Sequence, residues 1–284
     1  MKKSKLFSIL GAFALSATLL TSCESEAPQS SSADQELASV TEKLEKLGFN
    51  TELLQKTTLN GVSGYAVEGD IFLTIPQINE MLPAVTVNNG EVESEHYRTT
   101  YIVSTPRTVN VYMDSQFNST MQAAFDDALA RYNSLGLNIS FQRASSAGAD
   151  IDILAEKMQK VRGGGTILGR SAGFPDASGN PATPIVLNVD VYNPRRGSIP
   201  ADAATVIAHE IGHAIGFRHT DYMDRSFSCG GSYYNEGDGG AGVGAQYIPG
   251  TPAGPENGSW MLSCSNGTDR PFTASDRTAL TTVY

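Results

Sequence analysis

The most constraining feature of this chain is a run of eleven residues, HEIGHAIGFRH, that holds three of its four histidines. With so few histidines, the pattern H-E-x-x-H-x-x-G-x-x-H would arise by chance in on the order of 10⁻⁵ of such sequences. Four residues turn an α-helix by about 400°, so His209 and His213 stand one turn apart on the same face. The pattern therefore predicts a helix on which two imidazoles reach one metal ion.

A third ligand has to come from outside this helix. Gly216 can adopt the positive φ at which a chain leaves a helix, and His219 can then return toward the ion. Three neutral imidazoles favour zinc with a fourth position open to water, the arrangement of catalytic zinc sites. A structural zinc site is normally closed by four protein ligands, often cysteines, and no cysteine lies in this motif.

Glu210 follows the first histidine and is not needed as a ligand. A carboxylate beside the metal can accept a proton from a zinc-activated water and pass it to a departing amine. We therefore expect Glu210 to be the catalytic general base in the hydrolysis of a peptide bond.

The stretch HEIGHAIGFRHTD resembles the extended zinc signature of the metzincin metallopeptidases, and its residues are most similar to those of the dual-action HEIGH metallopeptidases. The resemblance implies an α+β catalytic domain with a twisted mixed sheet, a zinc-binding active-site helix, a Met-turn beneath the metal and a C-terminal helix. Met261, in the sequence Gly-Ser-Trp-Met, matches that Met-turn. Taken alone, a methionine is more often a core residue.

Two further expectations follow from the same resemblance. Some relatives place a tyrosine two residues after the methionine, where it can assist catalysis, whereas this chain has Ser263 there. The stretch 164–173 is expected at a sheet edge, where an extended substrate would bind by backbone pairing.

A second resemblance lies upstream, in the sequence VEGDI at 67–71. It is similar to the F-x-G-D-I stretch in prosegments of the astacin branch, where the aspartate occupies the open position of the zinc. Because a carboxylate is a competent zinc ligand, Asp70 is a candidate switch that blocks the site in a zymogen. The alternative is an ordinary Gly-Asp turn before a strand.

The N-terminus has the pattern of an export signal. Three lysines within the first five residues precede an apolar stretch, ending at Leu20, that is too short to span a bilayer comfortably. The sequence Leu-Thr-Ser-Cys that follows resembles a bacterial lipobox, which implies lipidation of Cys23 and anchoring to a membrane; an ordinary cleaved signal with an incidental cysteine is the alternative. We expect residues 1–22 to be a lipoprotein signal peptide. The product would be an exported lipoprotein of the bacterial cell envelope, at the outer membrane or cell surface, unless processing releases it.

The remaining chain divides by composition into three parts. Residues 23–36 are small, polar and acidic, and are expected to form a disordered tether. Residues 37–96 form a segment that is small for a self-sufficient domain and is expected to be the prosegment. Residues 97–284 are expected to form the metzincin-like catalytic domain.

Periodicity and turn signals predict the elements around the motif. An apolar stripe predicts a helix that begins near Met121 and stops near Gly136, and the zinc motif lies on a second helix over 201–215. Thr273 begins a last helix with a sequence that resembles a capping box. Strands are expected at 109–113, 137–142, 151–154 and 185–191, and a short helix at 40–47.

Cysteine usage fits an exported protein. Once Cys23 is set aside, Cys229 and Cys264 remain in a compartment where thiols oxidise, and we expect them to form a disulfide. Two free buried thiols are the alternative.

The formal net charge is −10, which argues against a nucleic-acid partner because such proteins present clustered basic residues. The Gly-rich stretch 230–244 contains Glu236 and Asp238, but these carboxylates lack the ligand spacing of a calcium site. We expect that stretch to be a flexible wall of the cleft, and zinc to be the cofactor.

These observations predict an exported or surface-anchored zinc endopeptidase with a protein or peptide substrate. Two other functions use the same residues: a zinc amidase acting on cell-wall or glycan-linked substrates, and a non-catalytic surface adhesin with a vestigial zinc site. The adhesin is disfavoured because Glu210 is present although binding a metal does not require it. The sequence leaves the oligomeric state open.

Overall fold

The computed structural model describes residues 32–81, 96–158, 165–195, 197–233, 235, 246–252 and 254–284. The expected signal peptide, Cys23, Glu236 and Asp238 lie outside these residues. Within the described ranges, no helix combines the length and the apolar character needed to cross a bilayer.

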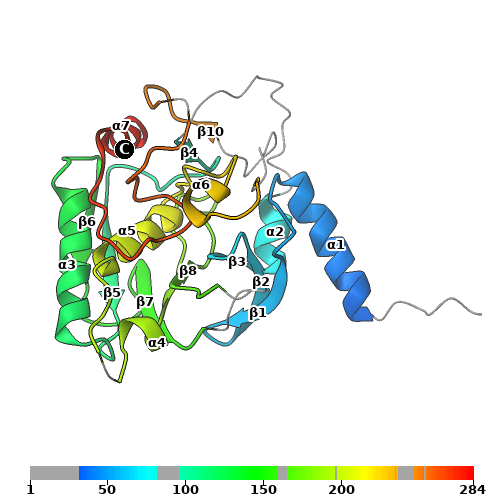
Figure 1. Cartoon of the computed structure of the whole chain (residues 1–284), viewed down its shortest axis with the longest axis horizontal. Helices are drawn as coiled ribbons and strands as arrows, with labels where there is room; N and C mark the ends of the chain where they lie inside the picture. The colour runs from blue at the N-terminus through cyan, green and yellow to red at the C-terminus, as the bar shows by residue number, and fades with distance from the viewer. Residues whose placement is uncertain are drawn as a thin grey trace, which may run out of the picture.

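The described residues form a mixed α+β fold, which confirms the expected class, around an eight-stranded sheet (Figure 1). Its strand order is β1-β2-β3-β8-β9-β7-β5-β6. The strands are β1 (Gln55–Leu59), β2 (Val62–Val67), β3 (Ile71–Leu73), β5 (Arg107–Met113), β6 (Ile139–Arg143), β7 (Ile151–Glu156), β8 (Gly169–Ser171) and β9 (Ile185–Asn188). Two short strands, β4 (Tyr97–Arg98) and β10 (Gln246–Tyr247), form a separate antiparallel pair.

Seven helices accompany the strands in the described part of the chain. They are α1 (Ser32–Lys46), α2 (Ile75–Met81), α3 (Ser119–Asn133), α4 (Val189–Tyr192), α5 (Ala203–Ala214), α6 (Ser226–Cys229) and α7 (Ala274–Val283). The stretch 185–191 is therefore not one strand as predicted, because the Asn188 side chain accepts a hydrogen bond from the Asp190 N–H and caps a helical turn there.

The helix that carries the zinc motif lies inside the core. Every residue of α5 is buried, and its contacts are mainly with α3 and with β8. The stripe predicted on α3 faces the same core, since Met121, Phe125, Leu129 and Tyr132 are buried there. The Tyr132 hydroxyl donates to the carbonyl of Ala208 at 2.7 Å and so ties α3 to the centre of α5.

The sheet changes direction at β8, next to α5. The pairs β5–β6, β5–β7 and β7–β9 are parallel, whereas β8 runs antiparallel to β9. β8 was expected to lie at a sheet edge, but β3 pairs with it in parallel register through Ile71 and Ser171. The three strands β1, β2 and β3 thus extend the sheet beyond the predicted edge.

The elements upstream of residue 82 gather at one side of the molecule, opposite α3 (Figure 1). Their own core contains Leu44 and Leu47, buried against Tyr65, Ile71 and Ile78. The helix α1 starts at Ser32, so residues 32–36 are not part of a disordered tether as predicted. The reason is a long-range contact, because the Glu36 carboxylate accepts from the Tyr65 hydroxyl at 2.6 Å and from Lys56 at 2.9 Å.

Candidate metal centre

The three histidines of the motif come together at the C-terminal end of α5. His209 and His213 lie on the helix, and the chain leaves it through Gly216, whose φ of +110° confirms the predicted turn. The His213 Nε2 atom lies 3.0 Å from the His209 Nε2 and 3.2 Å from the His219 Nε2. All three imidazoles are buried.

Hydrogen bonds from the other ring nitrogen leave the Nε2 atoms of His209 and His213 free to bind a metal. The His209 Nδ1 lies 2.8 Å from the carbonyl oxygen of Trp260, and the His213 Nδ1 lies 2.8 Å from that of Phe217. A carbonyl oxygen can only accept, so each Nδ1 carries the proton and each Nε2 presents a lone pair in the neutral ring. Two lone pairs 3.0 Å apart repel each other unless a cation lies between them. This arrangement is typical of metal-ligating histidines.

Asp70 completes a set of four donor atoms. Its Oδ2 lies 3.0 Å from the Nε2 of His219, 3.5 Å from that of His209 and 3.9 Å from that of His213. All four donor atoms lie within 4.8 Å of one another. Tetrahedral zinc with bonds of roughly 2.0–2.1 Å separates its ligands by about 3.3 Å, so the donor set fits zinc in both chemistry and spacing.

The protonation equilibria at the centre follow from burial and mutual charge. Burial lowers the pKa of His213 to about 4, which keeps its imidazole neutral and able to bind a metal at neutral pH. Burial acts to raise the pKa of Asp70, but the charge of His219 and hydrogen bonds from the three imidazoles hold that pKa well below its ordinary value. Asp70 is therefore a carboxylate at neutral pH.

Glu210 lies beside this set and is not one of the four donors. Its side chain is buried, and its Oε2 has no hydrogen-bond partner among the described residues. Burial, with the charge of Asp70 added, raises the pKa of the Glu210 carboxyl well above its ordinary value. A Cβ atom on Gly169 of β8 would lie 2.5 Å from its Oε1, so glycine is the residue that lets the glutamate pack against this strand.

Met261 is fully buried beneath α5, next to the motif. A Cβ on Gly212 would lie 2.5 Å from the Met261 Sδ and 3.2 Å from the Trp260 Nε1. Gly212, the glycine of the HEIGH sequence, therefore provides the space that the methionine turn occupies. The Met261 carbonyl accepts from the Thr220 N–H at 2.9 Å, which links this turn to the residue after His219.

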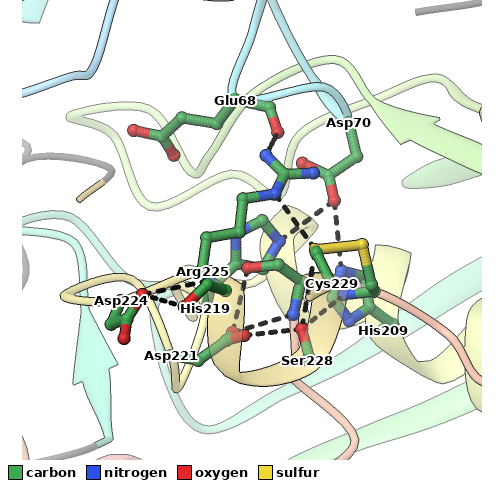
Figure 2. The surroundings of a disulfide bond; sticks show 12 residues. Glu68, Asp70, His209, His219, Asp221, Asp224, Arg225, Ser228 and Cys229 are labelled. Carbon is green, nitrogen blue, oxygen red and sulfur yellow. Dashed lines mark hydrogen bonds and ion pairs between the residues drawn. A yellow bond between two sulfur atoms is a disulfide. The ribbon is translucent and has the colours of Figure 1, made fainter. Parts of the chain in front are cut away.

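The cysteines flank the same region. Cys229 and Cys264 form a disulfide with an S–S distance of 2.11 Å (Figure 2). Asp221 is buried here and accepts from the Ser263 N–H at 2.9 Å and from the Ser228 hydroxyl at 2.6 Å. Ser263, which stands where some relatives have a tyrosine, is thus engaged in holding the loop after Met261.

Three arginines, which sequence reasoning did not single out, hold the loop that carries Asp70. The Arg218 Nη2 donates to both carboxylate oxygens of Glu68 at 2.8 and 2.9 Å, and both side chains are buried. Arg170 donates to the Gly69 carbonyl at 2.9 Å, and Arg225 donates to the Glu68 carbonyl. Figure 2 shows Arg225 reaching the Glu68 carbonyl while the Asp70 carboxylate points toward His209 and His219. Of the three arginines, Arg218 could have been noticed in the sequence, because it is a charged residue inside the metal motif.

A cavity of about 540 Å³ opens next to the metal centre. Its walls include His209 and Glu210 from α5, the stretch 165–169 that leads into β8, and the stretch 262–265 that follows Met261. Gly69 and Asp70 also line it, so the cavity is present while the Asp70 loop is in place.

A buried set of three imidazoles with an adjacent glutamate, on the α+β fold described above, defines a zinc metallopeptidase. The model of the family described as dual-action HEIGH metallo-peptidase matches residues 65–284. The chain belongs to this family, and the matched range includes Asp70 as well as the zinc motif. No curated protein sequence matches the chain.

Solved structures also show similarity to this chain. Two structures of myroilysin, each 13% identical, match with TM-scores of 0.41 and 0.39. They cover 66% and 71% of this chain and 98% and 94% of their own. High choriolytic enzyme 1, a hatching-enzyme zinc protease from the medaka fish Oryzias latipes, is 17% identical with a TM-score of 0.37, and covers 62% of this chain and 88% of its own.

Proposed function

We propose that this chain is the zymogen of an exported zinc endopeptidase in which Glu210 is the general base. The observation that carries the proposal is the position of a buried, partly unpartnered carboxylate beside three imidazoles whose Nε2 atoms converge. When held by His209, His213 and His219, zinc supplies a Lewis acid that polarises the substrate carbonyl and acidifies water.

Glu210 moves the proton in this reaction. It accepts a proton from the attacking water as the C–O bond forms, and it then delivers this proton to the nitrogen of the departing amine as the C–N bond breaks. Gly169 keeps the carboxylate against β8 and fixes its position.

Asp70 keeps the precursor inactive in this proposal. Its Oδ2 lies within 3.0–3.9 Å of all three imidazole Nε2 atoms, where water would otherwise bind. In addition, β3 pairs with β8, and the Ser171 N–H donates to the Asp70 carbonyl at 2.9 Å. A substrate that has to pair with β8 cannot do so while β3 is there.

The N-terminal part of the proposal rests on the sequence alone. The lipobox-like stretch supports cleavage before Cys23, lipidation of this residue and anchoring of the precursor to a membrane. Metabolic labelling with a radioactive fatty acid tests this, and Cys23→Ser is expected to abolish the incorporation. Equal labelling of both forms would exclude lipidation at Cys23.

The enzymatic proposal is tested with the purified full chain. We expect about one zinc per chain, little cleavage of casein by the wild type, and at least a tenfold increase in cleavage for Asp70→Ala, with Glu52→Ala as an exposed control in the same segment. Glu210→Gln in the Asp70→Ala background should keep its zinc and lose cleavage by a factor of roughly 10² or more. Full turnover in that variant would exclude Glu210 as the base.

The same preparation separates the other functions. Cleavage of peptidoglycan fragments but not of denatured proteins would identify an amidase. If both the wild type and Asp70→Ala bind zinc but hydrolyse neither substrate, the result would support the non-catalytic adhesin. A chelator should stop the hydrolysis, and added zinc should restore it.

A further inference from the structure

The cavity next to the metal centre has apolar walls and two arginines, Arg225 and Arg270. Ile167, Leu168, Val206 and Leu262 contribute apolar side chains, whereas Arg270 brings a guanidinium. A side chain of a substrate residue adjoining the scissile bond is the group that would enter here, because His209 and Glu210 lie on the cavity wall. The cavity thus bears on which peptide bonds are cut, and this inference rests on the proposed function.

Arg270 is held in this cavity without a close counter-ion. Its side chain is 8% exposed, and its Nη2 donates to the Cys264 carbonyl at 3.2 Å. Its Nε is buried and has no hydrogen-bond partner among the described residues. No carboxylate in the described part of the chain lies within ion-pair distance of Arg270. The charges of Asp221, Asp202 and Asp276 reach it only from further away.

The position of Arg270 relative to the metal centre is set by α5. Its backbone N–H donates to the Thr205 hydroxyl at 2.7 Å, and Thr205 precedes His209 by one helical turn. Four residues rise by about 6 Å along an α-helix, so the Arg270 backbone is attached to α5 about one turn before the first zinc ligand. Both Thr205 and Arg270 line the cavity.

We propose that this cavity binds an acidic side chain of the substrate through Arg270, so that the enzyme cleaves peptide bonds next to glutamate or aspartate. A buried cation without a bound anion is costly, and a carboxylate from the substrate would pair with it. Arg225 lines the same cavity, but its guanidinium already donates to the Glu68 carbonyl. A purely apolar substrate side chain would leave the Arg270 charge in this cavity without an ion-pair partner.

The first test changes the substrate and leaves the cavity residue Arg270 intact. The Asp70→Ala form of the full chain digests a denatured proteome, and mass spectrometry gives the residues on each side of every cleaved bond. We expect glutamate and aspartate to be enriched at one of the two positions that flank the bond. In a pair of peptides that differ only by Glu or Gln there, kcat/KM should be about 10- to 100-fold higher for Glu. Cleavage without this preference would overturn the inference and leave the proposed function intact.

Variants of Arg270 then test whether this residue causes the preference for an acidic side chain. Arg270→Gln should bring the Glu/Gln ratio close to one, and Arg270→Lys should retain part of it. An unchanged ratio in a folded Arg270→Gln protein would overturn the assignment to this residue.

A binding measurement judges the cavity independently of catalysis, because the cavity is present with the Asp70 loop in place. N-acetylglutamate amide should raise the melting temperature of the full chain more than N-acetylglutamine amide does, and Arg270→Gln should remove the difference. Equal shifts for both compounds would overturn the inference. No cleavage of any peptide, together with this difference in binding, would refute the endopeptidase while supporting the anion-binding cavity.

Discussion

Two glycines next to the metal centre act through their lack of a side chain. Gly169 leaves room for the Glu210 carboxylate, and Gly212 leaves room for the sulfur of Met261. Neither has a positive φ that would require glycine for the backbone itself. Close packing therefore accounts for both residues, and a methyl group at either position has to displace a residue of the site.

The first prediction concerns Gly169→Ala. The added Cβ would lie 2.5 Å from the Glu210 Oε1 and 2.9 Å from its Cγ, so the carboxylate has to move away from its place beside the imidazoles. We expect cleavage by the Asp70→Ala form to fall by about tenfold or more, since a misplaced proton-transfer group loses most of its effect. Zinc content and melting temperature serve as controls and should change little. Unchanged cleavage would show that β8 does not fix the position of Glu210.

Residue spacing explains which parts of the site could be predicted. The histidines and Glu210 lie within one helix and its exit, so their arrangement follows from helix geometry and could be derived from the sequence. The contacts of Glu210 with Gly169 and of Arg218 with Glu68 join segments that are far apart in the chain. No local pattern encodes such a contact, and Arg270 was overlooked for the same reason.

At the scale of elements, α7 and the methionine turn are joined through one carboxylate. Asp276 closes the capping box of α7 with Thr273. The same side chain accepts from the Ser259 hydroxyl at 2.7 Å and lies 2.8 Å from the His96 Nε2, both in the buried core. The capping sequence was predicted, whereas its link to the residues before Met261 was not.

The second prediction compares the two capping residues. Thr273→Ala removes one capping hydrogen bond and should lower the free energy of unfolding by about 1 kcal/mol. Asp276→Ala removes the other half of the box and also leaves the buried Ser259 hydroxyl and His96 Nε2 without their hydrogen-bond partner. The free energy of unfolding should therefore fall by about 3 kcal/mol. Urea unfolding followed by tryptophan fluorescence measures both values. Equal losses would mean that Asp276 serves α7 only.

The strand pattern shows where prediction from sequence reached its limit. Strands β5, β6 and β7 alternate or are apolar enough to be recognised, and each was expected close to its observed position. The pairing of β3 with β8 involves one register pair between short strands, for which the sequence carries no periodic signal. As a result, the stretch expected to form an open edge is instead covered in the full chain.

At the scale of the whole molecule, the segment before residue 82 and the rest of the chain are connected by sheet pairing and by a buried ion pair. Glu68, which lies two positions before Asp70, has a φ of +55° and is fully buried against Arg218. The Arg218 guanidinium also lies 4.9 Å from the centre of the Phe49 ring and 5.8 Å from that of Phe174. These two rings come from the two connected parts, so the arginine is enclosed at their junction.

The last prediction tests this junction with Glu68→Gln. Removing one partner of a buried ion pair leaves the other charge without compensation, so the free energy of unfolding should fall by about 3 kcal/mol. Because the Glu68 loop carries Asp70, we also expect more casein cleavage than in the wild type and less than in Asp70→Ala. Glu42→Gln is the matched control, since its pair with Lys46 is exposed and should change neither quantity measurably. A Glu68→Gln protein with wild-type stability and wild-type cleavage would show that the buried pair does not hold the Asp70 loop at the metal centre.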